Sequence, residues 1–229
     1  MGALAATIVL GGCGDPGDAP KPPPPRAVVA PARPAGAKVF PASAAHMLDD
    51  PSRDIWQRPD EVVAVLRILP GQRIADVGCG TGYFTLRLLR ATGSTGHVLA
   101  IDMQQEMLDI LGRRLDDGER KRVTLRRNAP DRPLEAADAV DLVFCANTLY
   151  EVDAPDVERF VKSMADGLAP GGRLAVLDWK PERARLGPPL EMRISPARIT
   201  ELARKAGLSP AEDIALLPTH TLLVFTKPK

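Results

Sequence analysis

From residue 59 to the C-terminus, apolar residues follow two alternating spacings. After Pro59, apolar residues from Val62 to Leu69 recur at helical intervals until Pro70 ends the run. Short β-rich runs and further amphipathic stretches then alternate, as expected for an α/β fold with a mainly parallel sheet covered on both faces. The pattern predicts strands at 73–77, 97–101, 123–127, 140–145 and 173–178, and helices at 84–90, 104–115 and 156–168.

The last 35 residues extend this pattern with one helix and a hairpin. Ser195 is a good N-cap, Pro196 favours the first helical turn, and Gly207 ends the helix. The apolar runs 213–217 and 219–226 are separated by a single proline. We expect them to form two antiparallel strands.

The first 45 residues differ from the rest. The apolar run 3–12 is about half of the roughly 20 residues that a membrane-spanning helix needs. It has the length of a signal-peptide apolar region and ends in small residues directly before Cys13, which resembles the lipobox of bacterial lipoproteins. We expect 1–13 to be a signal peptide with Cys13 as the lipidation site. The alternative is a short core strand or helix.

Residues 14–45 are rich in Pro, Gly and Ala and include four consecutive prolines at 22–25. Such a segment favours extended polyproline II structure and acts as a semi-rigid spacer. We therefore expect a linker at 14–45 and one domain at 46–229. Lipidation would anchor the chain to the membrane on the periplasmic side of the cell envelope. If the leader is not genuine, the expected location is cytoplasmic.

Composition narrows the classes of partner. Of the 229 residues, 30 are basic and 29 acidic, and no long block of like charge suggests a nucleic-acid-binding tail. Two Trp and two Tyr argue against an aromatic platform for nucleic acid. Three cysteines in a chain of this length form neither a disulfide framework nor a zinc motif. We expect a small-molecule substrate and no metal.

The candidate chemistry concentrates after the first predicted strand, in "DVGCGTG" at 76–82. Glycines at alternate positions adopt positive φ and let a ligand approach the backbone closely. Asp102, 20 residues past Gly82, ends the second strand, where a carboxylate can accept hydrogen bonds from ribose hydroxyls. Because a strand precedes the glycines and a helix follows, a nucleoside site is favoured over an ordinary tight turn.

The spacing of the glycines bears on which nucleoside is bound. A dinucleotide site would read Gly-x-Gly-x-x-Gly, whereas this chain has Gly-x-Gly-x-Gly. Asp76, two residues before the first glycine, suits a ligand ammonium group better than a pyrophosphate, by charge complementarity. These features favour S-adenosylmethionine as the cofactor.

With these motifs, residues 46 to 227 resemble a class I S-adenosylmethionine-dependent methyltransferase, of the group that includes ubiquinone and menaquinone biosynthesis enzymes. The matching motifs are the glycine loop, Asp102, "VDLVFCANTLYEV" at 140–152 and "LAPGGRLAVLDW" at 168–179. The resemblance implies a Rossmann-like three-layer sandwich. Its seven-stranded, mainly parallel sheet would end in the C-terminal antiparallel hairpin.

The resemblance also implies roles for individual residues. It assigns the glycine loop to the methionine moiety, Asp102 to the ribose and Met103 to the adenine face. In the third-strand loop, Asn128 and Ala129 stand where relatives often have an acidic residue, with Asp131 as a competing candidate. The expected cofactor-binding residues are Asp76, Gly78, Cys79, Gly80, Gly82, Asp102, Met103, Asn128, Ala129 and Asn147.

Methyl transfer is an in-line displacement that needs positioning and exclusion of water rather than a covalent intermediate. Tyr150 and Glu151, past the fourth strand, are the candidates for removing a proton from the acceptor, unless they are ordinary surface residues. Trp56 and Gln57, with Arg53, are expected to cover the cofactor, and Trp56 and Gln57 are also candidate substrate-binding residues.

Glu191 and Arg193 are expected in the acceptor pocket, with an ion pair that braces an insertion as the alternative. The three histidines are interpreted as structural or exposed rather than as ligands. Cys79 and Cys145 are expected at the ends of neighbouring strands as buried thiols, although a disulfide stays open.

The sequence therefore predicts a methyltransferase that uses S-adenosylmethionine and acts on an unidentified small molecule. A nucleoside-binding module without turnover is the alternative from another class. An NAD-dependent oxidoreductase is the weaker third reading.

Overall fold

A computed structural model describes residues 39–182 and 187–229 of the chain. The signal peptide, Cys13 and most of the expected linker lie outside these residues, so their assignment stays a prediction. None of the helices in the described ranges is long and apolar enough to cross a membrane.

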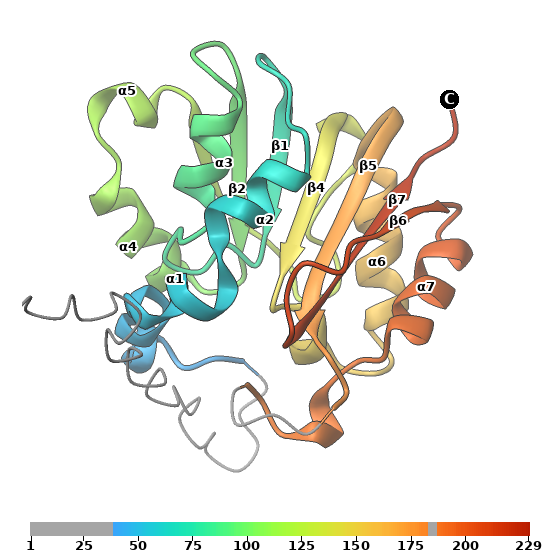
Figure 1. The fold of residues 1–229 in the computed structure, drawn as a ribbon. Coiled ribbons are helices and arrows are strands. Elements are labelled where there is room, and N and C mark those ends of the chain that lie inside the picture. Colours follow the sequence, from blue (N-terminus) through green and yellow to red (C-terminus); the bar gives the residue numbers. More distant parts are fainter. Residues whose placement is uncertain (1–38, 183–186) are drawn as a thin grey trace, which may run out of the picture.

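Seven strands form one sheet, and the expected α/β fold is confirmed (Figure 1). Strands β1 to β5 are parallel, β7 pairs antiparallel with β5, and β6 pairs antiparallel with β7. Across the sheet the order is β3 (Val123–Arg127), β2 (His97–Asp102), β1 (Arg73–Val77), β4 (Val140–Ala146), β5 (Leu168–Trp179), β7 (His220–Thr226) and β6 (Ser209–Asp213).

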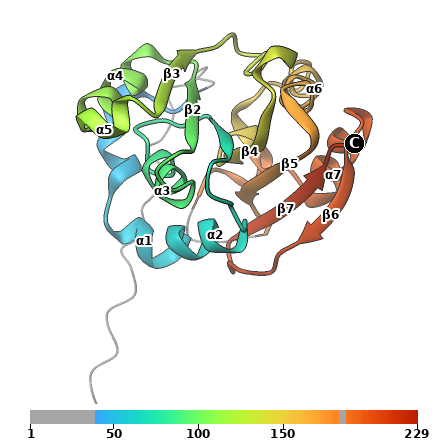
Figure 2. The same cartoon turned by 90° about the horizontal axis from the view of Figure 1, so that it is seen from above.

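Helices cover both faces of the sheet (Figure 2). The α-helices are α1 (Ser52–Gln57), α2 (Pro59–Val65), α3 (Thr85–Ala91), α4 (Gln105–Arg114), α5 (Asp117–Arg120), α6 (Val157–Asp166) and α7 (Pro196–Lys205). Short 3-10 helices are η1 (Ala42–Asp49), η2 (Ala136–Asp138), η3 (Leu149–Glu151) and η4 (Leu190–Met192).

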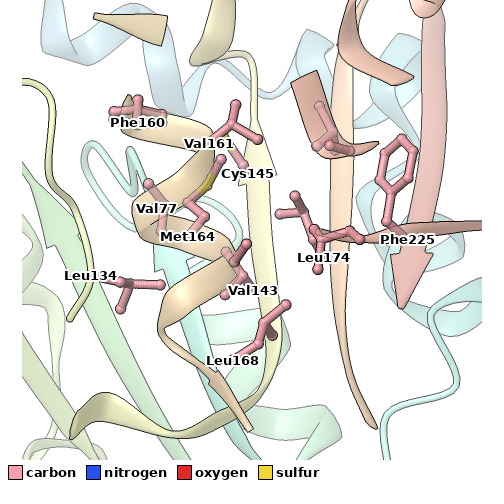
Figure 3. Packing of buried hydrophobic residues seen from close by; sticks show 14 of the residues in the cluster. Val77, Leu134, Val143, Cys145, Phe160, Val161, Met164, Leu168, Leu174 and Phe225 are labelled. Carbon is pink, nitrogen blue, oxygen red and sulfur yellow. The ribbon is translucent and has the colours of Figure 1, made fainter. Parts of the chain in front are cut away.

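The core has two halves because successive strand residues point to opposite faces of the sheet. In β4, Leu142 and Phe144 pack with residues of α2, α3 and α4, whereas Val143 and Cys145 pack with residues of α6 and α7. Figure 3 shows the second half, where Met164 of α6 lies over the sheet. The central strands β1, β2 and β4 are mostly buried, as expected for parallel strands covered on both sides.

The chain order creates a switch point in the centre of the sheet. From β1 the chain moves outward through β2 to β3, then returns to β4 on the other side of β1. In open α/β sheets, ligands bind beyond the carboxyl ends of the strands at such a point. Here those ends are formed by Val77 and Ala146.

The predicted elements differ clearly from the observed ones at three places. β5 begins at Leu168, inside the predicted helix 156–168, rather than at 173, because α6 ends at Asp166. The helix after Pro59 ends at Val65, because Arg67 adopts positive φ and turns the chain, which leaves Leu69 exposed. The hairpin begins earlier than expected, at β6 rather than at 213–217. β6 is a largely exposed edge strand, whereas Leu217, in the connection that follows it, is buried in the core.

The C-terminal helix was predicted correctly. Ser195 Oγ accepts a hydrogen bond from the Arg198 N–H at 3.2 Å, which satisfies one of the open donors of the first turn of α7. Gly207 has a positive φ of 89° after the helix and ends it as expected.

Candidate active site

A cavity of about 400 Å³ opens at the carboxyl ends of the central strands. The loops after β1, β2, β3 and β4 line it, together with the end of β5. Residues from 39 to 56 line it as well, although they precede the sheet in the chain. The cavity therefore lies at the switch point and combines segments that are far apart in the sequence.

The glycine loop forms one wall of the cavity. The N–H groups of Gly78 and Cys79 both donate to the carbonyl of Ile101, at 2.9 and 3.0 Å, which ties the loop to the end of β2. At Gly78, with φ of 74°, a Cβ would lie 2.1 Å from Thr148 Oγ1. A side chain at this position would therefore push apart the loops after β1 and β4.

Gly82 differs from the other two glycines of the loop. It is absent from the cavity lining, and its missing Cβ would lie 2.3 Å from Leu111 Cδ1 of α4. The sequence grouped Gly82 with the cofactor-binding residues because of its spacing. In the structure its requirement for glycine comes from packing against α4.

Asp102 joins the ends of β1 and β2. Its two carboxylate oxygens accept hydrogen bonds from the N–H groups of Gly80 and Gln104, each at 2.9 Å. It lines the cavity and is 8% exposed, so burial raises the pKa of this carboxyl, against the lowering effect of the backbone donors. Asp102 therefore shapes the glycine loop as well as presenting a carboxylate to a ligand.

Asp76 lies deeper in the same wall. Its side chain is almost fully buried and accepts a hydrogen bond from Thr85 Oγ1 at 2.6 Å. Burial raises the pKa of the Asp76 carboxyl to about 7, and the nearby negative charge of Asp102 acts in the same direction. A cationic group in the cavity would favour the ionised form.

The loop after β3 carries both candidates for the adenine contact, and only one of them lines the cavity. Asn128 lines the cavity, whereas Asp131 lies outside its lining and forms an ion pair with Arg159 at 2.8 Å. Ala129 is not part of the lining, but Pro130 is. Of the two candidates for the adenine contact, only Asn128 is therefore on the cavity lining. Pro130 lies on the lining where Ala129 was expected.

An aromatic cluster contributes two rings, Trp56 and Trp179, to the cavity lining. The rings of Trp56, Trp179 and His220 lie against one another, with Trp179 and His220 centroids 4.0 Å apart. The sequence predicted Trp56 near the site but missed the other two. Trp179 ends β5 and is the cross-strand partner of His220 at the start of β7, a pairing that only the sheet register reveals.

The segment before the sheet covers the cavity, as expected of a lid. The Arg53 guanidinium lines the cavity, lies 3.9 Å from the centroid of the Tyr83 ring, and donates to Gln57 Oε1 and to the Leu48 carbonyl, both at 2.6 Å. Gln57 is fully buried and absent from the lining. Its observed contact is with Arg53, so its expected place in the substrate site is not supported.

Tyr150 and Glu151 belong to the cavity lining and lie in η3, directly after β4. Glu151 Oε2 accepts a hydrogen bond from the Phe40 N–H at 3.3 Å, which ties the lid segment to this turn. Buried Asp178 lies next to this turn, and its Oδ1 accepts a hydrogen bond from the Trp179 N–H at 2.8 Å. Burial raises the pKa of Asp178 to about 7.

Glu191 and Arg193 lie outside the main cavity, contrary to the expectation. They line a separate groove, which shares the turn at 150–153 with the cavity. The Arg193 guanidinium donates to the carbonyls of Pro188, Lys180 and Glu182 at 2.9–3.0 Å. Arg193 therefore braces the segment after β5, which resembles the bracing role that was the alternative.

The charge of the lining is unbalanced. Arg53 is the only cationic side chain that the described residues contribute. In addition, Thr81 Oγ1 and Trp56 Nε1 are buried without a hydrogen-bond partner in the described part of the chain, and both residues line the cavity. Such atoms call for a partner. The cavity suits a ligand that carries positive charge and polar groups, since the acidic lining residues are Asp76, Asp102, Glu151, Asp153 and Asp156.

Two further features were open in the sequence. Cys79 and Cys145 are buried free thiols, as favoured over a disulfide. Within 39–182 and 187–229, no group of three or more His, Cys, Asp or Glu side chains is arranged to hold a metal ion.

Comparison with known proteins places this geometry in context. Residues 74–172 match the family described as "Methyltransferase domain". This chain is 34% identical to the ubiquinone/menaquinone biosynthesis C-methyltransferase of Vibrio campbellii over 114 residues, which are 48% of this chain. Over 124 residues, 54% of this chain, it is 34% identical to the demethylmenaquinone methyltransferase of Halalkalibacterium halodurans. The matches cover 42% and 49% of these relatives, less than half of each.

A solved structure matches over a larger part of the chain. The crystal structure of a SAM-dependent methyltransferase from Aquifex aeolicus is 28% identical, with a TM-score of 0.75, and the match covers 82% of this chain and 99% of that one. The structural match therefore covers a larger share of the chain than residues 74–172, which match the family.

Proposed function

We propose, from the premise that this chain carries a class I S-adenosylmethionine-dependent methyltransferase domain, that it transfers a methyl group to a small molecule. S-adenosylmethionine is the cofactor that this family implies. One observation carries the proposal: Asp76, the glycine loop and Asp102 line a single cavity whose acidic side chains outnumber its one cation. That balance suits a cofactor with both an ammonium and a sulfonium group.

The lining residues suit the parts of this cofactor. Asp102 would accept from the ribose hydroxyls, with Met103 and Asn128 near the adenine. Asp76 would meet the ammonium group, and Arg53 would meet the carboxylate of the methionine moiety, because it is the only cation that the described lining offers. Thr81 Oγ1 is a further polar atom available to the cofactor.

When bound, S-adenosylmethionine supplies a methyl carbon activated by positive sulfur. The chain's own contribution is to hold the acceptor in line and to keep water out. The lid segment, tied to the domain by the Phe40–Glu151 and Gln104–Phe40 hydrogen bonds, covers the cavity for this purpose. If the acceptor must lose a proton, Tyr150 and Glu151 are placed on the lining to take it.

Calorimetry with S-adenosylmethionine, S-adenosylhomocysteine and NAD tests the choice of cofactor. We expect binding of both sulfur nucleosides and none of NAD. The chain's two tryptophans, Trp56 and Trp179, both line the cavity, so intrinsic fluorescence reports on the same site. Binding should change this signal, and the change should be smaller in Trp56→Phe. If neither sulfur nucleoside binds, the proposed function is wrong.

The affinity for S-adenosylhomocysteine should depend on pH through Asp76. Its pKa in the folded chain is about 7, and only the ionised carboxylate attracts an ammonium group. The affinity should therefore rise about tenfold per pH unit from 5 towards 7 and level off above 7. Titrations at pH 5, 6, 7 and 8 check this, with Asp76→Asn as the control that should bind weakly and show no such rise.

The raised pKa of Asp76 has the opposite effect on the stability of the chain without ligand: stability falls as pH rises. The folded chain binds the Asp76 proton more tightly than the unfolded chain, because the pKa is raised from 3.8 to about 7. Its contribution to the free energy of unfolding is fully present below pH 3.8 and is lost as pH rises through 7. Wild type should therefore lose more stability over this range than Asp76→Asn, which urea unfolding can measure.

A second assay separates an enzyme from a binding module. The chain and S-adenosylmethionine, incubated with a protein-free extract of bacterial metabolites, should release S-adenosylhomocysteine, and Asp102→Ala should not. Binding of the cofactor with no release would favour the module without turnover. The two curated relatives are named for quinone biosynthesis, so extracts from quinone-rich cells are a suitable first source of acceptor.

Anchoring through Cys13 is a separate part of the proposal, supported by the apolar run that ends at this cysteine. Labelled fatty acid should attach to the full chain but not to Cys13→Ser, and the variant should leave the membrane fraction. An unchanged membrane fraction in Cys13→Ser would reject the anchor without affecting the methyltransferase proposal.

A further inference from the structure

A chain of hydrogen bonds joins β7 to the loop after β4. His220 Nε2 lies 3.0 Å from Asn147 Oδ1, and His220 Nδ1 lies 2.9 Å from Thr219 Oγ1. Asn147 lines the cavity, whereas His220 is 1% exposed and lies behind it. The two segments are 73 residues apart and meet only because β7 returns beside β5.

The chemistry of the partners determines the direction of this chain. An amide Oδ1 accepts and cannot donate, so the proton must be on His220 Nε2. A neutral imidazole then has a bare Nδ1, which accepts from the Thr219 hydroxyl. Burial, with the positive charges of Arg53, Arg193 and Lys180, lowers the pKa of His220 to about 3, so the ring is neutral.

The imidazole is held firmly in this orientation. It contacts both tryptophan rings: it is stacked on Trp56 at 12° with centroids 5.8 Å apart, and its centroid lies 4.0 Å from that of Trp179. The backbone supports the same arrangement, because Trp179 and His220 are paired across β5 and β7 and the Lys180 N–H donates to the Thr219 carbonyl at 3.0 Å.

Asn147 is held from a second side. It has a positive φ of 54°, a conformation in which asparagine is one of the few favoured residues, and its N–H donates to the Leu177 carbonyl at 2.8 Å. With Oδ1 used by His220, the amide NH₂ is the remaining polar group. No hydrogen bond within the described ranges occupies it.

We propose that Thr219 and His220 are positioning residues that hold the Asn147 amide with its N–H groups available to the methyl acceptor. The site would then select acceptors that offer a lone pair at this point, such as a carbonyl, hydroxyl or ring nitrogen. A cationic acceptor atom would meet N–H donors and is disfavoured. This inference rests on the proposed methyltransferase function, and it moves Asn147 from the cofactor to the acceptor.

The state of His220 can be tested without knowing the acceptor. Long-range ¹H–¹⁵N NMR of the full chain distinguishes the two neutral tautomers, and the chain has only three histidines to assign. We expect a neutral His220 with the proton on Nε2 at pH 5, a changed Nε2–H signal in Asn147→Leu, and a proton that stays on Nε2 in Asn147→Asp, which retains an oxygen acceptor. A proton on Nδ1, or a charged ring at pH 5, overturns the inference.

Matched substitutions test the consequence for turnover. His220→Phe keeps an aromatic ring beside Trp179 but removes both hydrogen bonds, whereas His220→Gln keeps an N–H donor near Nε2. Release of S-adenosylhomocysteine from S-adenosylmethionine is followed over a dilution series of the protein-free metabolite extract. We expect about a tenfold or larger loss for His220→Phe, with recovery to within about threefold of wild type for His220→Gln. Asn147→Asp should resemble His220→Phe.

Binding of S-adenosylhomocysteine separates this inference from the proposed function. All three variants should bind it within about threefold of wild type, because none of the substitutions is expected at a cofactor contact. An equal loss of turnover in His220→Phe and His220→Gln would overturn the positioning role. So would a loss of turnover that parallels a loss of affinity for S-adenosylhomocysteine. Failure of wild type to bind the nucleoside would instead reject the proposed function, and the NMR result would still decide the His220–Asn147 geometry.

Discussion

Asp102→Ala is expected to lower the affinity for S-adenosylhomocysteine by about 100-fold or more. The carboxylate has two functions at once: it would accept from the cofactor ribose, and it holds the Gly80 and Gln104 N–H groups at 2.9 Å. Hydrogen bonds to a charged group contribute about 1.5–3 kcal/mol each, so losing the ribose contacts alone accounts for this factor. Calorimetry measures the affinity.

Two controls separate binding from folding in this experiment. Asp102→Asn keeps one oxygen acceptor and should lose less affinity than Asp102→Ala. The alanine variant leaves two backbone donors without their partner, so its free energy of unfolding should fall by about 1–3 kcal/mol, which leaves it folded at room temperature if wild type has ordinary stability. Wild-type affinity in folded Asp102→Ala would contradict the proposed placement of the ribose.

Gly82→Ala is expected to destabilise the fold by about 2–4 kcal/mol. The residue has a φ of 90°, which alone costs an alanine about 1 kcal/mol. The new Cβ would also lie 2.3 Å from Leu111 Cδ1, and Leu111 is fully buried and has little room to move. Overpacking of this kind costs a further 1–3 kcal/mol or so.

Gly207→Ala is the matched control for this variant. It has nearly the same φ, 89°, but no atom lies within 4 Å of its missing Cβ and the residue is exposed. Urea unfolding should therefore show a loss of only about 1 kcal/mol for Gly207→Ala, with unchanged m-values in both variants. Equal losses would mean that Leu111 repacks easily. Because Gly82 is outside the cavity lining, the folded fraction of Gly82→Ala should bind S-adenosylhomocysteine normally.

Most of the fold could be predicted from local pattern. The strands at 73–77 and 123–127 were placed with the observed bounds, because each is a short run with β-branched residues that is followed directly by a loop. The edge of the sheet was harder. β6 is polar and exposed, and the apolar run after it packs into the core without forming a strand, so hydrophobicity pointed to the wrong residues.

For the site, the sequence was most informative about residues that lie at the end of a strand or directly after it. Asp76, Gly78, Gly80 and Asp102 were all predicted and all line one cavity, because parallel strands bring their carboxyl ends to the same edge. Spacing could not reveal that Gly82 belongs to helix packing. Nor could it show that Glu191 and Arg193 lie in a neighbouring groove.

The cofactor side of this protein is thus encoded in short motifs, since each loop there immediately follows the strand that positions it. The proposed acceptor side depends on contacts between distant segments: His220 reaches Asn147, and Trp179 meets Trp56, only through the antiparallel return of β7 and the placement of α1. A buried side chain's tautomer and partners depend on what surrounds it. That environment exists only once the sheet has formed.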